Sequence, residues 1–104
     1  MIKVMIGFNR KPGVDIQPTL HKLKSFAMTF QGFLGIESLE SEEGSPIVVL
    51  LFNWESSDDW NVWKASHIRK QILDGAQALL LDEPKVTAYK VVPFSGWPSE
   101  GLVP

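Results

Sequence analysis

Residues 47–67 read IVVLLFNWESSDDWNVWKASH, and this stretch decides how the rest of the chain must fold. Its first part, Ile47–Phe52, contains no polar residue, whereas a strand with one face in water should alternate apolar and polar side chains. Both faces of this strand must therefore be covered. Helices of the same chain can cover one face, but a chain of 104 residues has little left for the other. We expect a closed barrel or a second subunit on that face.

The composition excludes several classes of function. Ten Lys and Arg residues against twelve Asp and Glu residues give a formal net charge of −2, without an extended basic cluster, so we expect no nucleic acid partner. The absence of cysteine excludes disulfides, thiolate metal sites and a cysteine nucleophile. The longest apolar run is too short to span a membrane, and we recognise no signal peptide. We therefore expect a cytoplasmic protein that does not bind membranes.

Apolar periodicity and turn residues divide the chain into strands and helices. We expect strands over 2–8, 33–40, 47–54 and 86–92, a helix from about Asp15 to Gly32, and two short helices that start after Ser56 or Ser57 and after Ser66. The buried face of the first helix should carry Leu20, Leu23, Phe26, Ala27 and Phe30. A slip in alternation at Gly35 indicates a bulge.

The order strand, helix, strand, strand, helix pair, strand fits an α+β fold of the ferredoxin-like, split βαβ type. This fold has a four-stranded antiparallel sheet with helices on one face. We assign residues 1–93 to this domain and residues 94–104 to a C-terminal tail rich in Pro and Gly, which Phe94, Trp97 and Leu102 could hold in place.

The first strand has two unlike faces. Its even positions, Ile2 to Phe8, are all apolar and should pack against the helices, which leaves Met5, Gly7 and Asn9 on the opposite face. We predict that Met5 and Gly7 contact a substrate and that Asn9 forms a hydrogen bond with a substrate carbonyl. The alternative for Asn9 is structural, since asparagine beside a loop more often satisfies turn backbone.

The segments GFLGIESLES (32–41), VVLLFNWESSDDWNVW (48–63) and ASH (65–67) resemble the antibiotic biosynthesis monooxygenase superfamily. The resemblance covers residues 2–92. It implies a homodimer in which two ferredoxin-like subunits pack sheet to sheet into a dimeric α+β barrel, and this would also cover the apolar third strand. It further implies an oxygenase that uses no metal and no added cofactor and binds a flat aromatic substrate between sheet and helices.

Some members of the superfamily resemble haem-degrading enzymes. These use an Asn at the end of the first strand, a Trp on the helix after the third strand, and a His on the next helix that binds iron. Asn9 and Trp63 match the first two positions, but the third falls near Leu73, and His67 comes too early. We therefore expect no cofactor and no metal, and keep haem as an alternative.

Trp60, Trp63 and His67 have the spacing i, i+3 and i+7, so they share one face if the helix is continuous. Trp60 and Trp63 could then form the wall of an aromatic pocket, and His67 could accept a proton from a phenol or enol. Aromatic residues at this spacing also commonly pack a core. A cap at Ser66 would interrupt the helix and move His67 away.

No paired carboxylates, phosphate-binding glycine loop or serine elbow is present. The leading hypothesis is a cofactor-independent monooxygenase, an oxidoreductase that binds a small aromatic or polyketide-like molecule in an apolar barrel cavity. Asn9, Trp63 and His67 would be its catalytic residues, and Met5, Gly7 and Trp60 would bind the substrate. The alternatives are a ligand-binding or stress-response barrel without turnover and a haem-degrading monooxygenase.

Overall fold

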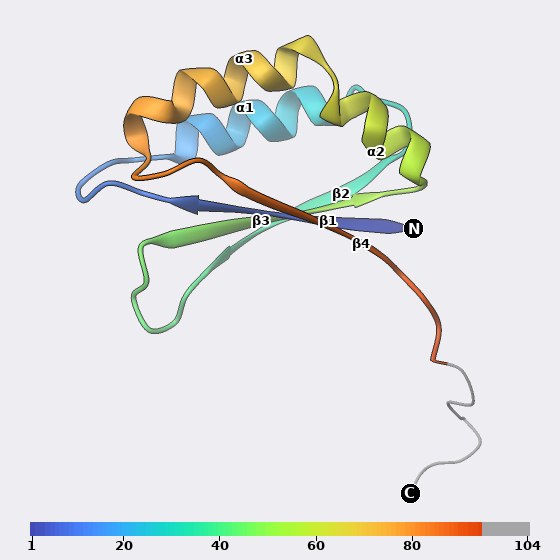
Figure 1. The fold of residues 1–104 in the computed structure, drawn as a ribbon, viewed down its shortest axis with the longest axis horizontal. Helices are drawn as coiled ribbons and strands as arrows, with labels where there is room; N and C mark the ends of the chain where they lie inside the picture. The colour runs from blue at the N-terminus through green and yellow to red at the C-terminus, as the bar shows by residue number, and fades with distance from the viewer. Residues whose placement is uncertain (95–104) are drawn as a thin grey trace, which may run out of the picture.

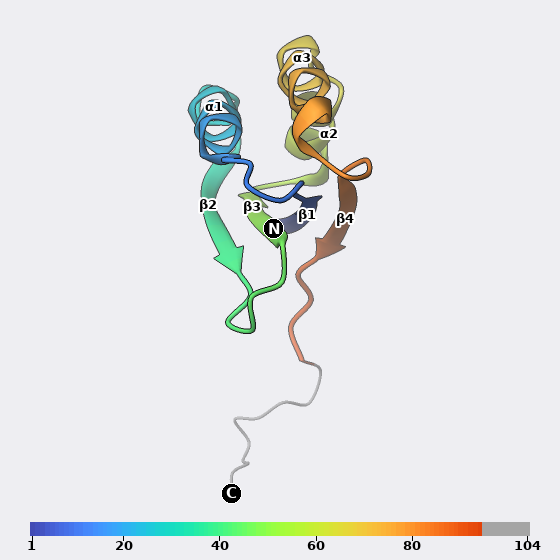
Figure 2. The same ribbon diagram turned by 90° about the vertical axis from the view of Figure 1, so that its left-hand side faces the viewer.

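The computed structural model describes residues 1–94, which form one sheet covered by helices on one face (Figure 1). In chain order the elements are β1 (Ile2–Asn9), α1 (Gln17–Ala27), β2 (Phe33–Glu40), β3 (Ile47–Trp54), α2 (Ser57–Lys64), α3 (His67–Ala76), the short 3-10 helix η1 (Gln77–Leu79) and β4 (Lys85–Lys90). The strand order is β2-β3-β1-β4 with every neighbouring pair antiparallel. The expected α+β, ferredoxin-like sheet is confirmed, and Figure 2 shows α1, α2 and α3 on its same side.

Local chemistry accounts for several of the element boundaries. The carboxylate of Asp15 accepts a hydrogen bond from the backbone N–H of Gln17 at 3.0 Å, and Pro18 lies in the first turn of α1, where its missing N–H costs nothing. The predicted bulge at Gly35 is confirmed, because Phe33 pairs with Trp54 and Gly35 with Asn53, so that Leu34 has no partner in the register.

Two sequence-based boundaries and one predicted buried position were wrong. The first helix ends at Ala27 instead of Gly32, because Thr29 and Phe30 donate tighter, turn-type bonds to Phe26 and Ala27. Phe26 is 43% exposed, not buried, since successive helical residues are about 100° apart and Ala27 already takes the buried position. The last strand runs from Lys85 to Lys90 instead of 86–92.

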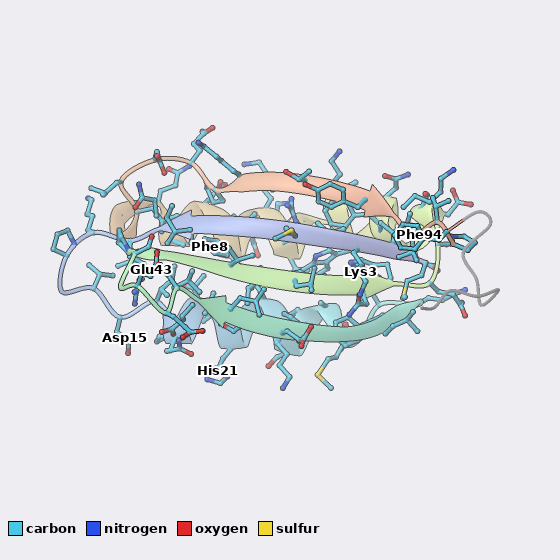
Figure 3. All side chains as sticks on the ribbon, turned by 90° about the horizontal axis from the view of Figure 1, so that it is seen from below. Lys3, Phe8, Asp15, His21, Glu43 and Phe94 are labelled. Atoms are coloured by element: carbon cyan, nitrogen blue, oxygen red, sulfur yellow. The ribbon has the colours of Figure 1, made fainter. Side chains whose placement is uncertain are left out.

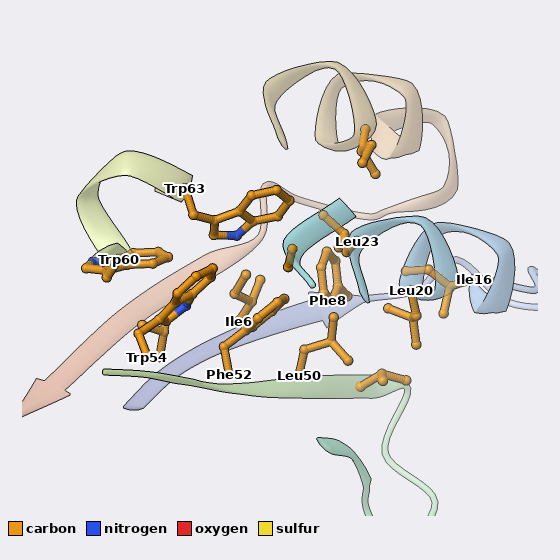
Figure 4. Close-up of a cluster of buried hydrophobic side chains, with 14 of the residues drawn as sticks. Ile6, Phe8, Ile16, Leu20, Leu23, Leu50, Phe52, Trp54, Trp60 and Trp63 are labelled. Carbon is orange, nitrogen blue, oxygen red and sulfur yellow. The ribbon is translucent and has the colours of Figure 1, made fainter. Parts of the chain in front are cut away.

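The core lies between the sheet and the helices. The even-numbered residues of β1 and of β3 all point into it, and at its centre Trp54 packs against Trp63 with ring centroids 6.2 Å apart. Figure 4 shows these two rings with Phe52 beneath the helices. Burial of aromatic rings of this size contributes much of the apolar stabilisation of a small domain.

The opposite side of the sheet, which we call the open face, carries the odd-numbered residues of β1 and β3. Figure 3 views it from the side away from the helices. Val49 and Leu51 are only half-buried there, and Ile47 is 44% exposed. Nothing within residues 1–94 fully covers the second face of β3, although Ile47, Val49 and Leu51 on that face are apolar.

Across residues 1–94, no helix combines the length and apolar character that a membrane crossing requires. Of the predicted tail, only Phe94 belongs to the described part of the chain, and it is exposed. The expected contacts of Trp97 and Leu102 fall outside the described residues.

Candidate functional site

A hollow of about 90 Å³ lies on the open face where β1 ends, and its lining residues are Gly7, Asn9, Ile47, Asp82 and Lys85. The strand register brings them together, because Gly7 pairs with Lys85 of β4 and Asn9 pairs with Ile47 of β3. The backbone N–H of Leu81 also donates to the carbonyl of Asn9 at 2.9 Å. This bond holds the segment before β4 against the end of β1 and places Asp82 at the hollow.

The side chain of Asn9 is the polar centre of this hollow. Its Oδ1 is buried and accepts no hydrogen bond from residues 1–94. A buried polar atom without a partner costs about 1–3 kcal/mol, so most such atoms in proteins are paired. The alternative role, in which the Asn9 side chain bonds to turn backbone, is not seen within this range. The contact with the neighbouring turn is instead made by the backbone carbonyl of Asn9, which accepts the N–H of Leu81. Asn9 is therefore a polar residue at the hollow whose buried acceptor no described residue satisfies.

The hollow is also lined by two ionisable residues, which the sequence analysis did not identify. Asp82 follows the turn after η1, and Lys85 is the first residue of β4. Their position beside Asn9 depends on β4 pairing with β1. Neither residue belongs to a motif in the sequence, so no local signal marked Asp82 or Lys85.

The structure places the other predicted open-face positions as expected. Met5 lies two residues from Gly7 on the same face, half-buried between Leu51 of β3 and Thr87 of β4 in the register. Because Gly7 has no side chain, it leaves the space that the hollow occupies beside Ile47. Of the two residues, only Gly7 lines the hollow, and Met5 lies beyond it along the open face.

Trp60 and Trp63 lie on the other side of the sheet from Asn9. Trp63 is fully buried, with its ring 4.9 Å from Phe30 and 6.2 Å from Trp54 between centroids. Since Asn9 belongs to the open face, the sheet separates it from Trp63. The single pocket that the sequence hypothesis built from these residues does not form, and the alternative of a packed aromatic core is what the structure contains.

Trp60 is also closed to a flat ligand. The guanidinium of Arg69 stands over its ring, 5.6 Å from the centroid. Burial lowers the pKa of Arg69, because a desolvated cation loses hydration that is only partly replaced. The Nε of Arg69 is buried without a partner among the described residues. Attraction between the cation and the ring offsets part of that cost.

His67 does not join the two tryptophans. α2 ends at Lys64, and Ser66 begins a new helix by accepting the backbone N–H of Arg69 at 3.3 Å. The continuous helix required by the i, i+3, i+7 alignment is therefore absent. His67 is exposed at the start of α3, with its Nε2 3.2 Å from Nε2 of Gln71.

The residues on the helix side do not fit a haem group. Leu73, at the position where the resemblance to haem-degrading enzymes would require an iron-binding histidine, is an aliphatic residue packed against the core. Trp63 has no exposed surface, and its ring contacts protein aromatics. We derive no step that involves haem.

We compared the chain with known protein families, sequences and solved structures. No family model matches the chain, and no curated protein matches its sequence. Among solved structures, an antibiotic biosynthesis monooxygenase has a TM-score of 0.76 at 16% identity, with 89% of this chain and 100% of that chain covered. A candidate antibiotic biosynthesis monooxygenase from Nitrosomonas europaea has a TM-score of 0.75 at 13% identity, with coverages of 89% and 100%.

A third similar structure is SnoaB from Streptomyces nogalater, described as a cofactor-independent oxygenase. Its TM-score is 0.76 at 12% identity, with 92% of this chain and 97% of that chain covered. These similarities define the class of architecture as the ferredoxin-like α+β fold. Within that class, the chain has the fold of the antibiotic biosynthesis monooxygenase proteins, which its sequence motifs had indicated. Fold alone does not fix the reaction.

Proposed function

We propose that this protein is a cofactor-independent oxygenase that binds a small aromatic or polyketide-like molecule over Asn9, in a cavity closed by a second copy of the chain. The observation that carries the proposal is the buried, unpartnered Oδ1 of Asn9 beside a hollow on an otherwise apolar sheet face. Binding sites commonly combine an apolar surface with a few polar groups that fix the orientation of the ligand.

Two observations support a second copy: the small size of the hollow and the apolar character of the face around it. A volume of about 90 Å³ is far below the roughly 300 Å³ at which ligand pockets usually begin. The apolar side chains of Val49 and Leu51 surround it without cover from the described part of the chain. Two open faces packed together would bury these side chains and enlarge the hollow into a cavity that excludes water.

The proposed chemistry requires only a stabilised substrate anion and molecular oxygen. A phenol or enol next to a methylene group loses a proton, and the resulting anion donates electrons to O2. One oxygen atom becomes the new carbonyl oxygen, and the other leaves as water with the two methylene hydrogens. The substrate supplies all the electrons, so no external reductant is consumed.

The residues of the hollow have distinct tasks in this reaction. The Asn9 amide would donate through Nδ2 to the substrate oxyanion. The Lys85 ammonium would favour the anion by its charge, and the Asp82 carboxylate, which also lines the hollow, would accept the proton. Met5 and Gly7 would contact the ring. We assign no step to His67 or Trp63, because neither lines the hollow.

Oxygen uptake with an anthrone, which has a methylene group activated by a ketone and two rings, tests the proposal. Asn9→Leu should lower kcat/KM by about 100-fold or more, the usual effect of losing an oxyanion donor. Asn61→Leu, a change of the same type at an exposed position of α2, should leave it unchanged. Equal effects of the two variants would refute the role of Asn9. Binding of anthrones and related phenols without oxygen uptake would instead support the non-catalytic ligand-binding barrel.

A further inference from the structure

A second concave site lies on the helix side of the sheet, between α1 and β2. Its volume is 190 Å³, and its lining residues are Gln17, Leu20, His21, Lys24, Ile36, Ser38 and Leu50. We call it the edge groove, because β2 is the outermost strand. Ser38 pairs in register with Leu50, whose side chain is buried under the helices. The sheet therefore separates the edge groove from the hollow at Asn9.

The floor of the edge groove is apolar. Leu20 comes from α1 and Leu50 from β3, and both are almost completely buried. Figure 4 shows Leu20 reaching from the helix towards the strand that carries Leu50. Ile36 of β2 packs against the same core and extends the floor to the edge of the sheet. This surface suits one ring or a short hydrocarbon chain.

The wall above this floor is polar and carries only positive charge. Gln17, His21 and Lys24 follow one another at i, i+4 and i+7 along α1, so they lie on one side of the helix. The hydroxyl of Ser38 faces them from β2. None of these four side chains forms a hydrogen bond or ion pair with another described residue, and no Asp or Glu lines the groove. A ligand with a negative group would find donors here and no repelling carboxylate.

From this arrangement we propose that the edge groove binds a small carboxylate with a single apolar ring, of the size of benzoate. The ring would lie on Leu20, Ile36 and Leu50, and the carboxylate would accept hydrogen bonds from Lys24 and Ser38, since bonds to charged groups are the stronger ones. A cavity of about 150 Å³ holds benzene, so 190 Å³ has room for a ring and its carboxylate. The proposal does not depend on the oxygenase function.

Titration of the full chain with benzoate, followed by two-dimensional NMR, tests this site. We expect dissociation in roughly the millimolar range for so small a ligand. The largest shifts should fall on the Ile36 methyl groups and the His21 ring. Benzamide, which has the same shape without the charge, should bind about tenfold more weakly, as expected for the loss of a charge-assisted hydrogen bond. Inorganic phosphate should not displace benzoate, because it has no apolar part.

Two matched variants identify the charge that matters. Lys24→Gln should weaken benzoate binding about tenfold. Lys22→Gln removes the same charge from α1 at a position outside the groove, and it should leave the affinity unchanged. Both side chains are exposed, so both variants should fold. The proposal would be overturned if both variants lost the same affinity for benzoate or if benzamide bound as tightly as benzoate. It would also be overturned if the NMR shifts centred on Asn9 or if no binding occurred at 10 mM benzoate. Oxygen uptake should be the same in Lys24→Gln as in the wild type.

Discussion

At the scale of single residues, the contact between Gly32 and Asp59 fixes how the segment after α1 meets the first turn of α2. Gly32 has a φ of +83°, and a Cβ placed there would lie within 2.6 Å of the Cβ of Asp59 and overlap its carboxylate. The carbonyl of Gly32 also accepts the backbone N–H of Glu55 at 2.8 Å. The two segments therefore meet at a point where no side chain fits.

Gly32→Ala should lower the free energy of unfolding by about 3 kcal/mol. Left-handed backbone costs alanine about 1–2 kcal/mol, and overpacking against Asp59 adds about 1–3 kcal/mol. Urea denaturation followed by tryptophan fluorescence measures the change.

Gly44→Ala is the matched control for this substitution. Gly44 has the same φ of +83° with no atom within 4 Å of the added Cβ, so it should lose only the backbone part, about 1–2 kcal/mol. Equal losses in the two alanine variants would show that the contact with Asp59 carries no energy. The sequence pattern had marked Gly32 only as a helix stop, because its neighbour Asp59 is distant along the chain.

At the scale of elements, a cap on α2 fixes where the aromatic helix begins. The Oγ of Ser56 accepts the backbone N–H of Asp59 at 3.1 Å and donates to the Asp59 carboxylate at 2.8 Å. The negative charge of Asp59 also lies near the positive end of the helix dipole. Two turns of helix would be marginal alone, so the cap and the burial of Trp60 and Trp63 hold α2 together.

Ser56→Ala should lower the free energy of unfolding by about 1 kcal/mol, the usual effect of removing an N-cap. Ser57→Ala is the natural comparison, because Ser57 is the next residue, is exposed and has no capping bond. Its effect should stay within about 0.5 kcal/mol. Thermal unfolding of the two variants under one buffer condition measures the difference, and a larger loss for Ser57→Ala would contradict the assigned cap.

Most helices and strands could be predicted from the sequence, but some of their ends and contacts could not. Alternation in β1, the Pro18 turn and the serine caps are local signals, and they predicted the elements correctly. The predicted end of α1 was wrong because hydrogen bonds of a turn, donated by Thr29 and Phe30, replace further helical hydrogen bonds. The hollow at Asn9 could not be predicted in full, since Asp82 and Lys85 reach it only through the pairing of β4 with β1.

At the scale of the whole molecule, the two sides of the sheet differ in how completely they are covered. On the helix side, Trp54, Trp63 and Phe52 fill the layer. On the open face, an apolar strip along β3 has no cover from residues 1–94, apart from a polar pair in which Lys3 Nζ donates to Asn53 at 2.8 Å. An apolar strip of this kind, bordered by polar groups, is typical of an interaction surface. This is why the proposed oxygenase needs a second copy.

Sedimentation should give twice the chain mass of 11.7 kDa for the wild type at micromolar concentration. Leu51→Lys places a charge at the centre of the open face and should give the monomer mass, because a buried unpaired charge costs several kcal/mol. Val62→Lys adds the same charge at an exposed position on α2, so it should remain a dimer. A monomeric wild type would remove the closed cavity. In that case Asn9 would lie in a shallow surface hollow, where water could quench the substrate anion.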